Sequence, residues 1–243
     1  MKNPYRLLGL GLCLAGALFA AVAHLTMESV PLTAIALSGI VIGIVCLALP
    51  NYRPYISAEA CQILLRTGTE NTAALLQGLG LEDKALYLPS SVTGGHTQAI
   101  IPLEDGNRKL VQGRIPGRLM VRCGAGPDDV GIAVTTPGSM INEILKSTPG
   151  PTAEDIESAA SYILIGVLDL ADSVTVGLSG ARVDVLVRGA RLRYERTWYH
   201  HCLGSPTASI MAAICSEALS KPVRIGQERY SRGESHITLE VLS

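Results

Sequence analysis

The feature of this sequence that most limits its fold is a pair of uncharged apolar runs at the N-terminus. No Asp, Glu, Lys or Arg occurs in residues 7–27, and a second uncharged run covers residues 29–52. A helix rises about 1.5 Å per residue, so each run is long enough to cross the roughly 30 Å hydrocarbon core of a bilayer. Pro31 and Pro50 bracket the second run where a helix begins and ends. The sequence therefore predicts a transmembrane helical hairpin over residues 1–52, with spans at about 7–27 and 32–49.

The same N-terminus also fits a cleaved secretory signal peptide. Lys2 and Arg6 form a basic start, and Ala21-Val22-Ala23 has the small-x-small pattern of a cleavage site. The apolar run ahead of His24 is long for a signal peptide. Both alternatives stay open at this point, with residues 1–23 as the segment that cleavage would remove.

The basic residues that flank the two runs predict the orientation of the hairpin. Lys2 and Arg6 precede the first run, Arg53 and Arg66 follow the second, and the connection between the runs carries neither Lys nor Arg. Cytoplasmic loops are enriched in these residues, so we expect a multi-pass protein of the cell membrane with both termini in the cytoplasm. Residues 53–243 would then be a cytosolic domain, and its scattered cysteines, without a CxxC pair, agree with a reducing compartment.

Small residues recur within both apolar runs. They stand at Gly9, Cys13, Ala17 and Ala21 in the first run, and at Gly39 and Gly43 in the second. Such strips let helix backbones approach closely in lipid, where packing holds helices together. The strips are candidates for packing the two spans against each other or for assembly between copies of the chain.

The charges of the remaining residues exclude one class of function. Residues 51–243 carry 18 basic and 20 acidic side chains, a net charge of −2. A nucleic-acid-binding protein needs a clustered basic surplus, so nucleic acid is not an expected partner. These charges are about a fifth of the 193 residues, somewhat fewer than in an average soluble domain. We interpret this shortage as a sign that a partner, another copy or the membrane covers part of the surface.

Turn-forming Gly and Pro residues divide residues 57–243 into alternating helical and strand-like segments. Helices are expected over 57–79, from Thr136-Pro137, from Thr152 and from Ser205-Pro206, where the last three begin with capping signals. Strands are expected over 85–88, 98–103, 118–122, 130–134, 173–178, 182–187, 222–227 and 235–242. The order predicts an α+β fold: a transmembrane hairpin followed by a layered domain of helix-plus-β-hairpin units with a mainly antiparallel sheet.

Several segments resemble an uncharacterised archaeal family of membrane proteins in which a two-helix hairpin precedes a domain of unknown function. The matching segments are Tyr55-Ile56-Ser57-Ala58-Glu59-Ala60, Leu79-Gly80-Leu81, Ala85-Leu86-Tyr87-Leu88-Pro89, Ser205-Pro206-Thr207-Ala208-Ser209 and Lys221-Pro222-Val223-Arg224-Ile225. This resemblance implies the two-part architecture and no activity. The last fifty residues are also faintly similar to vinyl-reductase-type ligand-binding domains. The cysteines of that family's final hairpin have no counterpart, since none follows Cys215.

Three short motifs were considered as sites of chemistry. Gly177-Leu178-Ser179-Gly180-Ala181 is similar to a nucleophile elbow, but its strand-turn-strand context favours a hairpin turn. His200-His201-Cys202 offers metal-ligand types, but neighbours on an extended segment point to opposite faces. Thr135-Thr136-Pro137-Gly138-Ser139 offers backbone N–H groups at a helix start, as every capped helix does. We therefore assign no catalytic residue, no metal ligand and no cofactor.

The most unusual stretch, residues 188–201, mixes basic and aromatic side chains. It holds Arg188, Arg191, Arg193, Arg196, Trp198 and Tyr199. This mixture suits a protein contact or a lipid-headgroup surface, and a solvated strand and loop is the alternative. We expect a membrane-anchored, non-enzymatic protein whose cytosolic domain assembles with itself or binds a partner near the bilayer. The alternative is a membrane-tethered sensory module for a small apolar or anionic ligand.

Overall fold

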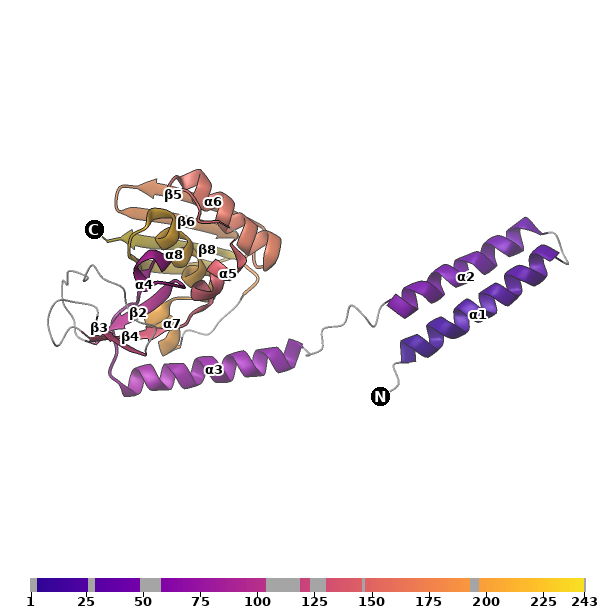
Figure 1. The fold of residues 1–243 in the computed structure, drawn as a ribbon, viewed down its shortest axis with the longest axis horizontal. Helices are drawn as coiled ribbons and strands as arrows, with labels where there is room; N and C mark the ends of the chain where they lie inside the picture. The colour runs from indigo at the N-terminus through magenta and orange to yellow at the C-terminus, as the bar shows by residue number, and fades with distance from the viewer. Residues whose placement is uncertain are drawn as a thin grey trace. The chain divides into compact units, whose positions relative to one another are not determined.

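The N-terminal part of the computed structural model is an antiparallel pair of helices (Figure 1). The structure describes residues 4–25, 29–48, 58–103, 119–122, 130–145, 147–192 and 197–242. The chain divides into two compact units, Met1–Leu65 and Arg66–Ser243. The predicted domain boundary after residue 52 lies outside the described residues.

The helical pair consists of α1 (Pro4–Leu25) and α2 (Val30–Ala48). Pro31 lies in the first turn of α2, where its missing N–H leaves no bond unmade. The Ser29 carbonyl oxygen accepts hydrogen bonds from the backbone N–H and the hydroxyl of Thr33, which begins the helix. Both helices are long and apolar enough to cross a bilayer.

A third segment reaches the same length and hydropathy but has a different place in the molecule. It runs from Trp198 to Leu219, and 89% of it is buried inside the C-terminal unit. Its apolar character is therefore that of a core element, and α1 and α2 are the membrane-span candidates among the described residues.

The C-terminal unit is built on one eight-stranded sheet in which every neighbouring pair is antiparallel. The strand order is β3-β4-β2-β1-β7-β8-β6-β5. The strands are β1 (Leu86–Leu88), β2 (Gln98–Pro102), β3 (Met120–Arg122), β4 (Val130–Val134), β5 (Ser173–Ser179), β6 (Arg182–Arg188), β7 (Val223–Ser231) and β8 (Glu234–Val241). The predicted α+β class with a mainly antiparallel sheet is confirmed. Pairing of β1 with β7, which joins the two halves of the sheet, has no signal in the sequence.

The remaining elements are helical. They are α3 (Ala58–Gly78), α4 (Ser90–Thr93), η2 (Pro137–Met140), α5 (Ile141–Ile144), α6 (Ala153–Ser161), the π-helical η3 (Tyr162–Val167), α7 (Trp198–Leu203) and α8 (Pro206–Leu219). Helix α6 with η3 precedes the β5–β6 hairpin, and α8 precedes the β7–β8 hairpin. These are the two predicted helix-plus-hairpin units.

The main core lies between the sheet and α8, which Figure 1 shows beside α6 on one face of the sheet. Eleven consecutive residues of α8, from Ala208 to Ala218, are buried. A second, smaller cluster on β1, β2 and β3 contains Leu88, Ile100 and Val121, with Val92 of α4 packed against it. Tyr87 belongs to the main core and Leu88 to the smaller one, as alternation along a strand requires.

A buried carboxylate anchors α8 to the start of α4. Glu217, only 6% exposed, accepts hydrogen bonds from Ser90 N–H (2.7 Å), Ser90 Oγ (2.9 Å) and Thr97 Oγ1 (2.6 Å). Three donors on one carboxylate offset the cost of burying its charge. Glu217 is thereby a structural residue that fixes the end of α8 against β1 and β2.

Candidate functional site

Helix α7 forms one wall of a pocket beside the N-terminus of α8. The sequence analysis treated residues 200–202 as extended, and the structure corrects this: they lie in a helix. Helix α7 has six residues, fewer than two turns, so its sequence shows no apolar periodicity that would predict a helix. Its signals are Thr197, which precedes it, and Gly204, which ends it with φ +74°. The positive φ of Gly204 favours glycine, and a Cβ there would also lie 2.4 Å from Ile225 Cδ1, the end of a flexible side chain.

Hydrogen bonds to strand β1 and the segment before it hold α7 in place. The Trp198 indole N–H donates to the Leu81 carbonyl oxygen (2.8 Å). The Ala85 N–H donates to the Cys202 carbonyl oxygen (2.8 Å), and the Tyr87 hydroxyl to that of Leu203 (2.6 Å). Burial raises the pKa of Tyr87, so its hydroxyl stays a proton donor. Trp198 therefore has a structural role in α7, besides its predicted role at a surface.

The pocket next to α7 has a volume of about 390 Å³ and mixed polarity. Lys84, His200 and Glu228 supply its polar groups. Lys84 Nζ donates to the Gly226 carbonyl oxygen, and Glu228 Oε2 accepts from Ser205 N–H (3.1 Å). These groups therefore also hold the pocket walls together.

His200 and Cys202 are both held in their neutral forms. Burial lowers the pKa of His200, and the nearby Glu228 carboxylate opposes this shift. His200 Nδ1 lies 2.9 Å from Thr197 Oγ1 and 3.4 Å from the Thr197 nitrogen, whose N–H donates to it. Burial, together with the negative charge of Asp83, raises the pKa of Cys202 to about 11. The thiol is therefore protonated at neutral pH and is a poor nucleophile.

The other motifs considered for chemistry occupy structural positions. Ser179 and Gly180 lie at the turn between β5 and β6. At η2, Ser139 N–H donates to Thr136 Oγ1 (3.3 Å) and Gly138 N–H donates to Ser209 Oγ on α8 (3.0 Å). Both backbone N–H groups of this short turn therefore already have acceptors within the protein. No set of three His, Cys, Asp or Glu side chains in the described part of the chain is placed to hold a metal ion.

The face of β5, β6, β7 and β8 that points away from α8, here called the open sheet face, carries polar side chains in cross-strand rows. One row, read from β7 to β5, is Gln227, Thr238, Asp184 and Gly177, and the next is Arg229, His236, Leu186 and Thr175. These eight residues, with Arg182, line a hollow of about 530 Å³. The open sheet face is therefore a second candidate for ligand binding.

A β-bulge in β7 determines which side chains reach the open sheet face. Ile225 pairs with Leu239, but the next pair is Gln227 with Thr238, so Gly226 is the extra residue. One extra residue reverses the alternation of side chains. Glu228 consequently lies on the helix side, where it accepts from Ser205 N–H, and Arg229 lies on the open sheet face. The sequence predicts a strand over residues 222–227, and β7 continues beyond it to Ser231.

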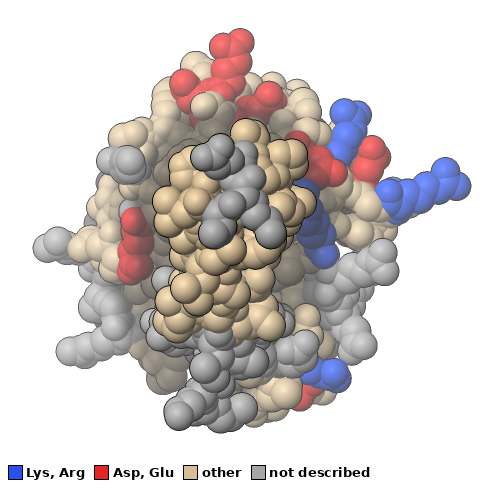
Figure 2. Space-filling model, turned by 90° about the vertical axis from the view of Figure 1, so that its right-hand side faces the viewer, with Lys and Arg blue, Asp and Glu red and all other residues tan. Residues whose placement is uncertain are grey.

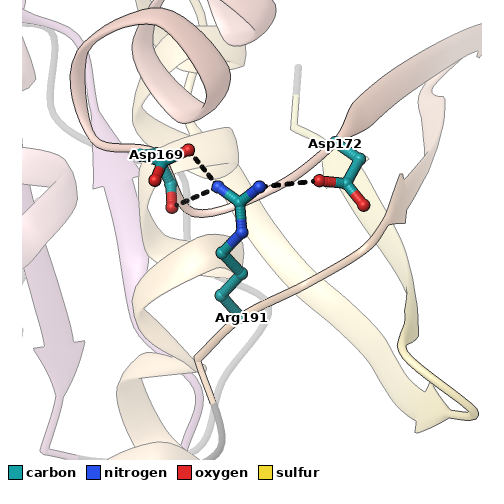
Figure 3. Close-up of polar contacts among 3 residues, drawn as sticks. All are labelled: Asp169, Asp172 and Arg191. Atoms are coloured by element: carbon teal, nitrogen blue, oxygen red, sulfur yellow. Dashed lines mark hydrogen bonds and ion pairs between the residues drawn. The ribbon is translucent and has the colours of Figure 1, made fainter.

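Arg191 ties the end of η3 to the segment after β6 (Figure 3). Its guanidinium lies between two carboxylates. One nitrogen donates to both the backbone oxygen of Asp169 (2.9 Å) and the Asp169 side chain, and the other nitrogen donates to Asp172 Oδ1 (2.8 Å). Arg191 N–H also donates to the Leu170 carbonyl oxygen (2.9 Å). A Cβ at Gly189, where φ is +66°, would lie 2.0 Å from Asp172 Oδ2. We call this set of contacts the Arg191 clamp.

The structure places only part of the predicted basic and aromatic surface. Arg193 and Arg196 lie outside the described residues. Arg188 pairs with Glu234 on β8 (3.2 Å), and Arg191 forms the clamp. Trp198 and Tyr199 are half-buried on α7, and burial raises the pKa of Tyr199. A joint surface of all six side chains stays a prediction.

Close backbone contacts join α1 and α2. A Cβ at Gly9 would lie 2.8 Å from the Gly43 carbonyl oxygen, and one at Gly43 would lie 2.5 Å from Cys13 Sγ. Gly16 makes the same kind of contact with Ile40. Cys13 Sγ also donates to the Ile40 carbonyl oxygen at 3.7 Å. Gly9, Cys13 and Gly43 of the predicted strips therefore pack the two helices together.

The other strip residues point away from this interface. Ala17 and Ala21 are exposed, and a Cβ at Gly39 would have no neighbour within 4 Å. Four residues turn a helix by about 400°, so an every-fourth strip drifts around the helix. Gly16 and the buried Ala23 continue the interface instead. Figure 2, which views the hairpin from the α1–α2 connection, shows no described Lys, Arg, Asp or Glu on the helix surface facing the viewer.

Comparison with known families identifies what kind of chain this is. A family described as a domain of unknown function, DUF7982, matches residues 1–241. The chain belongs to the DUF7982 family. The match includes both the helical hairpin and the sheet domain. Comparison with curated proteins and with solved structures gave no match.

Sequence reasoning missed three features of this DUF7982 chain that its candidate sites depend on. Helix α7 is too short to show periodicity, and the bulge at Gly226 hides the outward position of Arg229. The buried Glu217 has a weak signal: it is the only charged residue in the apolar segment 206–219. A lone carboxylate in an apolar helix points to a buried polar anchor.

Proposed function

We propose that this DUF7982 protein is a membrane-anchored, non-enzymatic protein whose C-terminal domain binds another copy of the chain or a partner protein close to the bilayer. In this proposal α1 and α2 span the cell membrane. Lys2 and Arg6 before α1, and Arg53 and Arg66 after α2, favour a cytoplasmic location for both termini. The domain then faces the cytoplasm.

One observation carries the proposal: η3 and the chain beside the Arg191 clamp carry exposed apolar side chains. Tyr162 and Val167 of η3 and Leu168 at its end are 36–47% exposed, and Leu192 beside Arg191 is 37% exposed. The bond from Arg191 N–H to the Leu170 carbonyl holds the chain at Leu192 against the end of η3. We call these four apolar residues the η3 patch.

The composition of the η3 patch and its surroundings supports a protein contact. Interfaces are enriched in aromatic residues and Arg, and depleted in charges that lack partners. At this patch Arg191 binds both Asp169 and Asp172, so each carboxylate has a cationic partner and the three side chains together carry a net charge of −1. The patch is held in a fixed backbone conformation by the clamp, which lowers the entropy cost of binding.

The mass of the intact particle tests this proposal. The full chain would be extracted in mild detergent and measured by native mass spectrometry. We expect a homo-oligomer or a stoichiometric protein partner, and the Val167→Asp variant should dissociate it. Leu79→Asp, at an equally exposed residue of the chain remote from η3 in sequence, is the control and should leave the particle intact. A wild-type monomer without a protein partner would contradict the proposal.

A second candidate function is a membrane-tethered sensory module for a small ligand. The α7 pocket and the hollow on the open sheet face support it, because about 390 and 530 Å³ lie within the size range of small-molecule sites. In the same experiment, a monomer with a stoichiometric small molecule would favour this candidate. The archaeal origin and the similarity of the last fifty residues to vinyl-reductase-type domains stay predictions.

A further inference from the structure

The hollow on the open sheet face is lined by one positively charged side chain that no carboxylate of the described residues balances. Three arginines of this face pair with carboxylates: Arg182 with Asp184 of the same strand (2.9 Å), and, across neighbouring strands, Arg188 with Glu234 (3.2 Å) and Arg224 with Glu240 (2.6 Å). Arg229 also lines the hollow, and no carboxylate of the described residues pairs with it. The side chains lining the hollow therefore carry a net charge of +1 with His236 neutral, since Arg182 and Asp184 cancel.

Hydrogen-bonding side chains lie next to Arg229 on the open sheet face. His236 is its direct cross-strand partner, and Gln227 lies two residues before it on the same face. Cross-strand partners have Cβ atoms about 5 Å apart, so one bound group can reach both. Thr175 lies at the far end of the same row, with Leu186 between it and His236. One side of the hollow thus offers donors, and its floor offers an apolar side chain.

We propose that this hollow binds a small monocarboxylate, with the carboxylate on Arg229 and the apolar body over Leu186. The inference rests on the second candidate function and names its ligand class. A guanidinium presents two parallel N–H donors that match the two oxygens of a carboxylate. The bulge at Gly226 makes this possible because it turns Arg229 outward.

The adjacent row of the sheet explains why the ligand carries a single charge. Asp184 lies in that row, where it accepts hydrogen bonds from Arg182 Nε (2.9 Å) and Thr238 Oγ1 (3.0 Å). Its carboxylate repels a second negative charge within the hollow. A phosphate dianion would need more positive charge than Arg229 alone supplies, so we expect it to bind more weakly than a carboxylate.

Titration calorimetry on the full chain in detergent micelles tests the ligand class. The probes are butyrate, its neutral analogue butyramide, and inorganic phosphate. We expect saturable binding of butyrate, weaker binding of phosphate and none of butyramide. Absence of saturable butyrate binding, or tighter binding of phosphate than of butyrate, would overturn the proposal.

Three variants test the site. Arg229→Gln should weaken butyrate binding about tenfold or more, because it removes the charge-assisted pair. Arg224→Gln, on the same face but already paired with Glu240, should change the affinity less than about twofold. Arg229→Lys keeps the charge without the two-pronged geometry and should give an intermediate loss. Equal losses in Arg229→Gln and Arg224→Gln would overturn the assignment of the site.

Native mass spectrometry separates failure of this inference from failure of the sensory function. A small molecule bound to the wild type and lost from Arg229→Gln supports both. A small molecule still retained by Arg229→Gln would leave the sensory function standing and overturn the site. Trp198, the single tryptophan, reports by its fluorescence whether the Arg229→Gln domain unfolds at the wild-type temperature. If the two unfolding temperatures agree, the domain is folded and the loss of binding is due to the change at the site.

Discussion

Gly43 of α2 lies directly against Cys13 of α1: a Cβ at Gly43 would come within 2.5 Å of Cys13 Sγ. A Gly43→Ile change therefore forces the two helices apart, and we expect it to destabilise the hairpin by roughly 1–3 kcal/mol. Gly39→Ile is the matched control, because its Cβ has no neighbour within 4 Å. Thermal stability in detergent distinguishes the two variants. If Gly39→Ile instead reduced the particle size, Gly39 would belong to an interface between copies.

Glu217 should be among the least replaceable residues of the domain. Glu217→Ala leaves the Ser90 N–H and the Thr97 hydroxyl without their acceptor and opens a cavity. We expect a loss on the order of 3 kcal/mol in the free energy of unfolding. Glu143→Ala, at an exposed residue of α5, should have little effect. Trp198 fluorescence during thermal unfolding measures both, and comparable stabilities would show that Glu217 is not an anchor.

Glu157 protects the edge strand β5. Its Oε2 accepts a hydrogen bond from Val176 N–H (2.8 Å), which would otherwise be open to another strand. Glu157→Ala should lower stability by roughly 1 kcal/mol and increase self-association through the edge. Size-exclusion chromatography at increasing concentration measures the association, with Glu154→Ala on the exposed side of α6 as the control. The same elution for both variants would mean that Glu157 does not guard this edge.

The lowered pKa of His200 predicts a pH dependence of stability. Because burial favours the neutral imidazole, the unfolded chain binds more protons than the folded one below the ordinary His pKa of 6.5. The contribution of the neutral His200 to the free energy of unfolding is thus fully present above pH 6.5, and it is lost as the pH falls toward the lowered pKa. His200→Gln should flatten the fall in unfolding temperature below pH 6.5, and His201→Gln should not. Parallel curves for wild type and His200→Gln would contradict this origin.

The sequence predicted those parts of the fold whose signals are local. The uncharged runs, the caps at Thr152 and Ser205, and the alternation in β5 and β6 gave the hairpin and both helix-plus-hairpin units. Pairing of β1 with β7 escaped prediction because it joins residues more than 130 positions apart. The outward position of Arg229 could not be predicted, because one bulge residue reverses the face of every later side chain in β7.

Burial also changes how the cysteines can be used. Cys202 and Cys215 lie in the domain whose side of the membrane a thiol reagent could report. Both are buried, and burial raises their pKa values to about 11 and about 12, so they would escape a thiol reagent on either side. Cys61 on α3 is exposed and follows the hairpin, which makes it the better reporter.

Labelling of Cys61 tests most directly whether the hairpin anchors the domain on the cytoplasmic side. A variant that keeps Cys61 and has its other five cysteines changed to Ser or Ala would be expressed in cells and treated with a maleimide that cannot cross membranes. We expect no labelling in intact cells and full labelling once the membrane is permeabilised. Labelling of Cys61 in intact cells would place the domain outside and contradict the proposed anchoring.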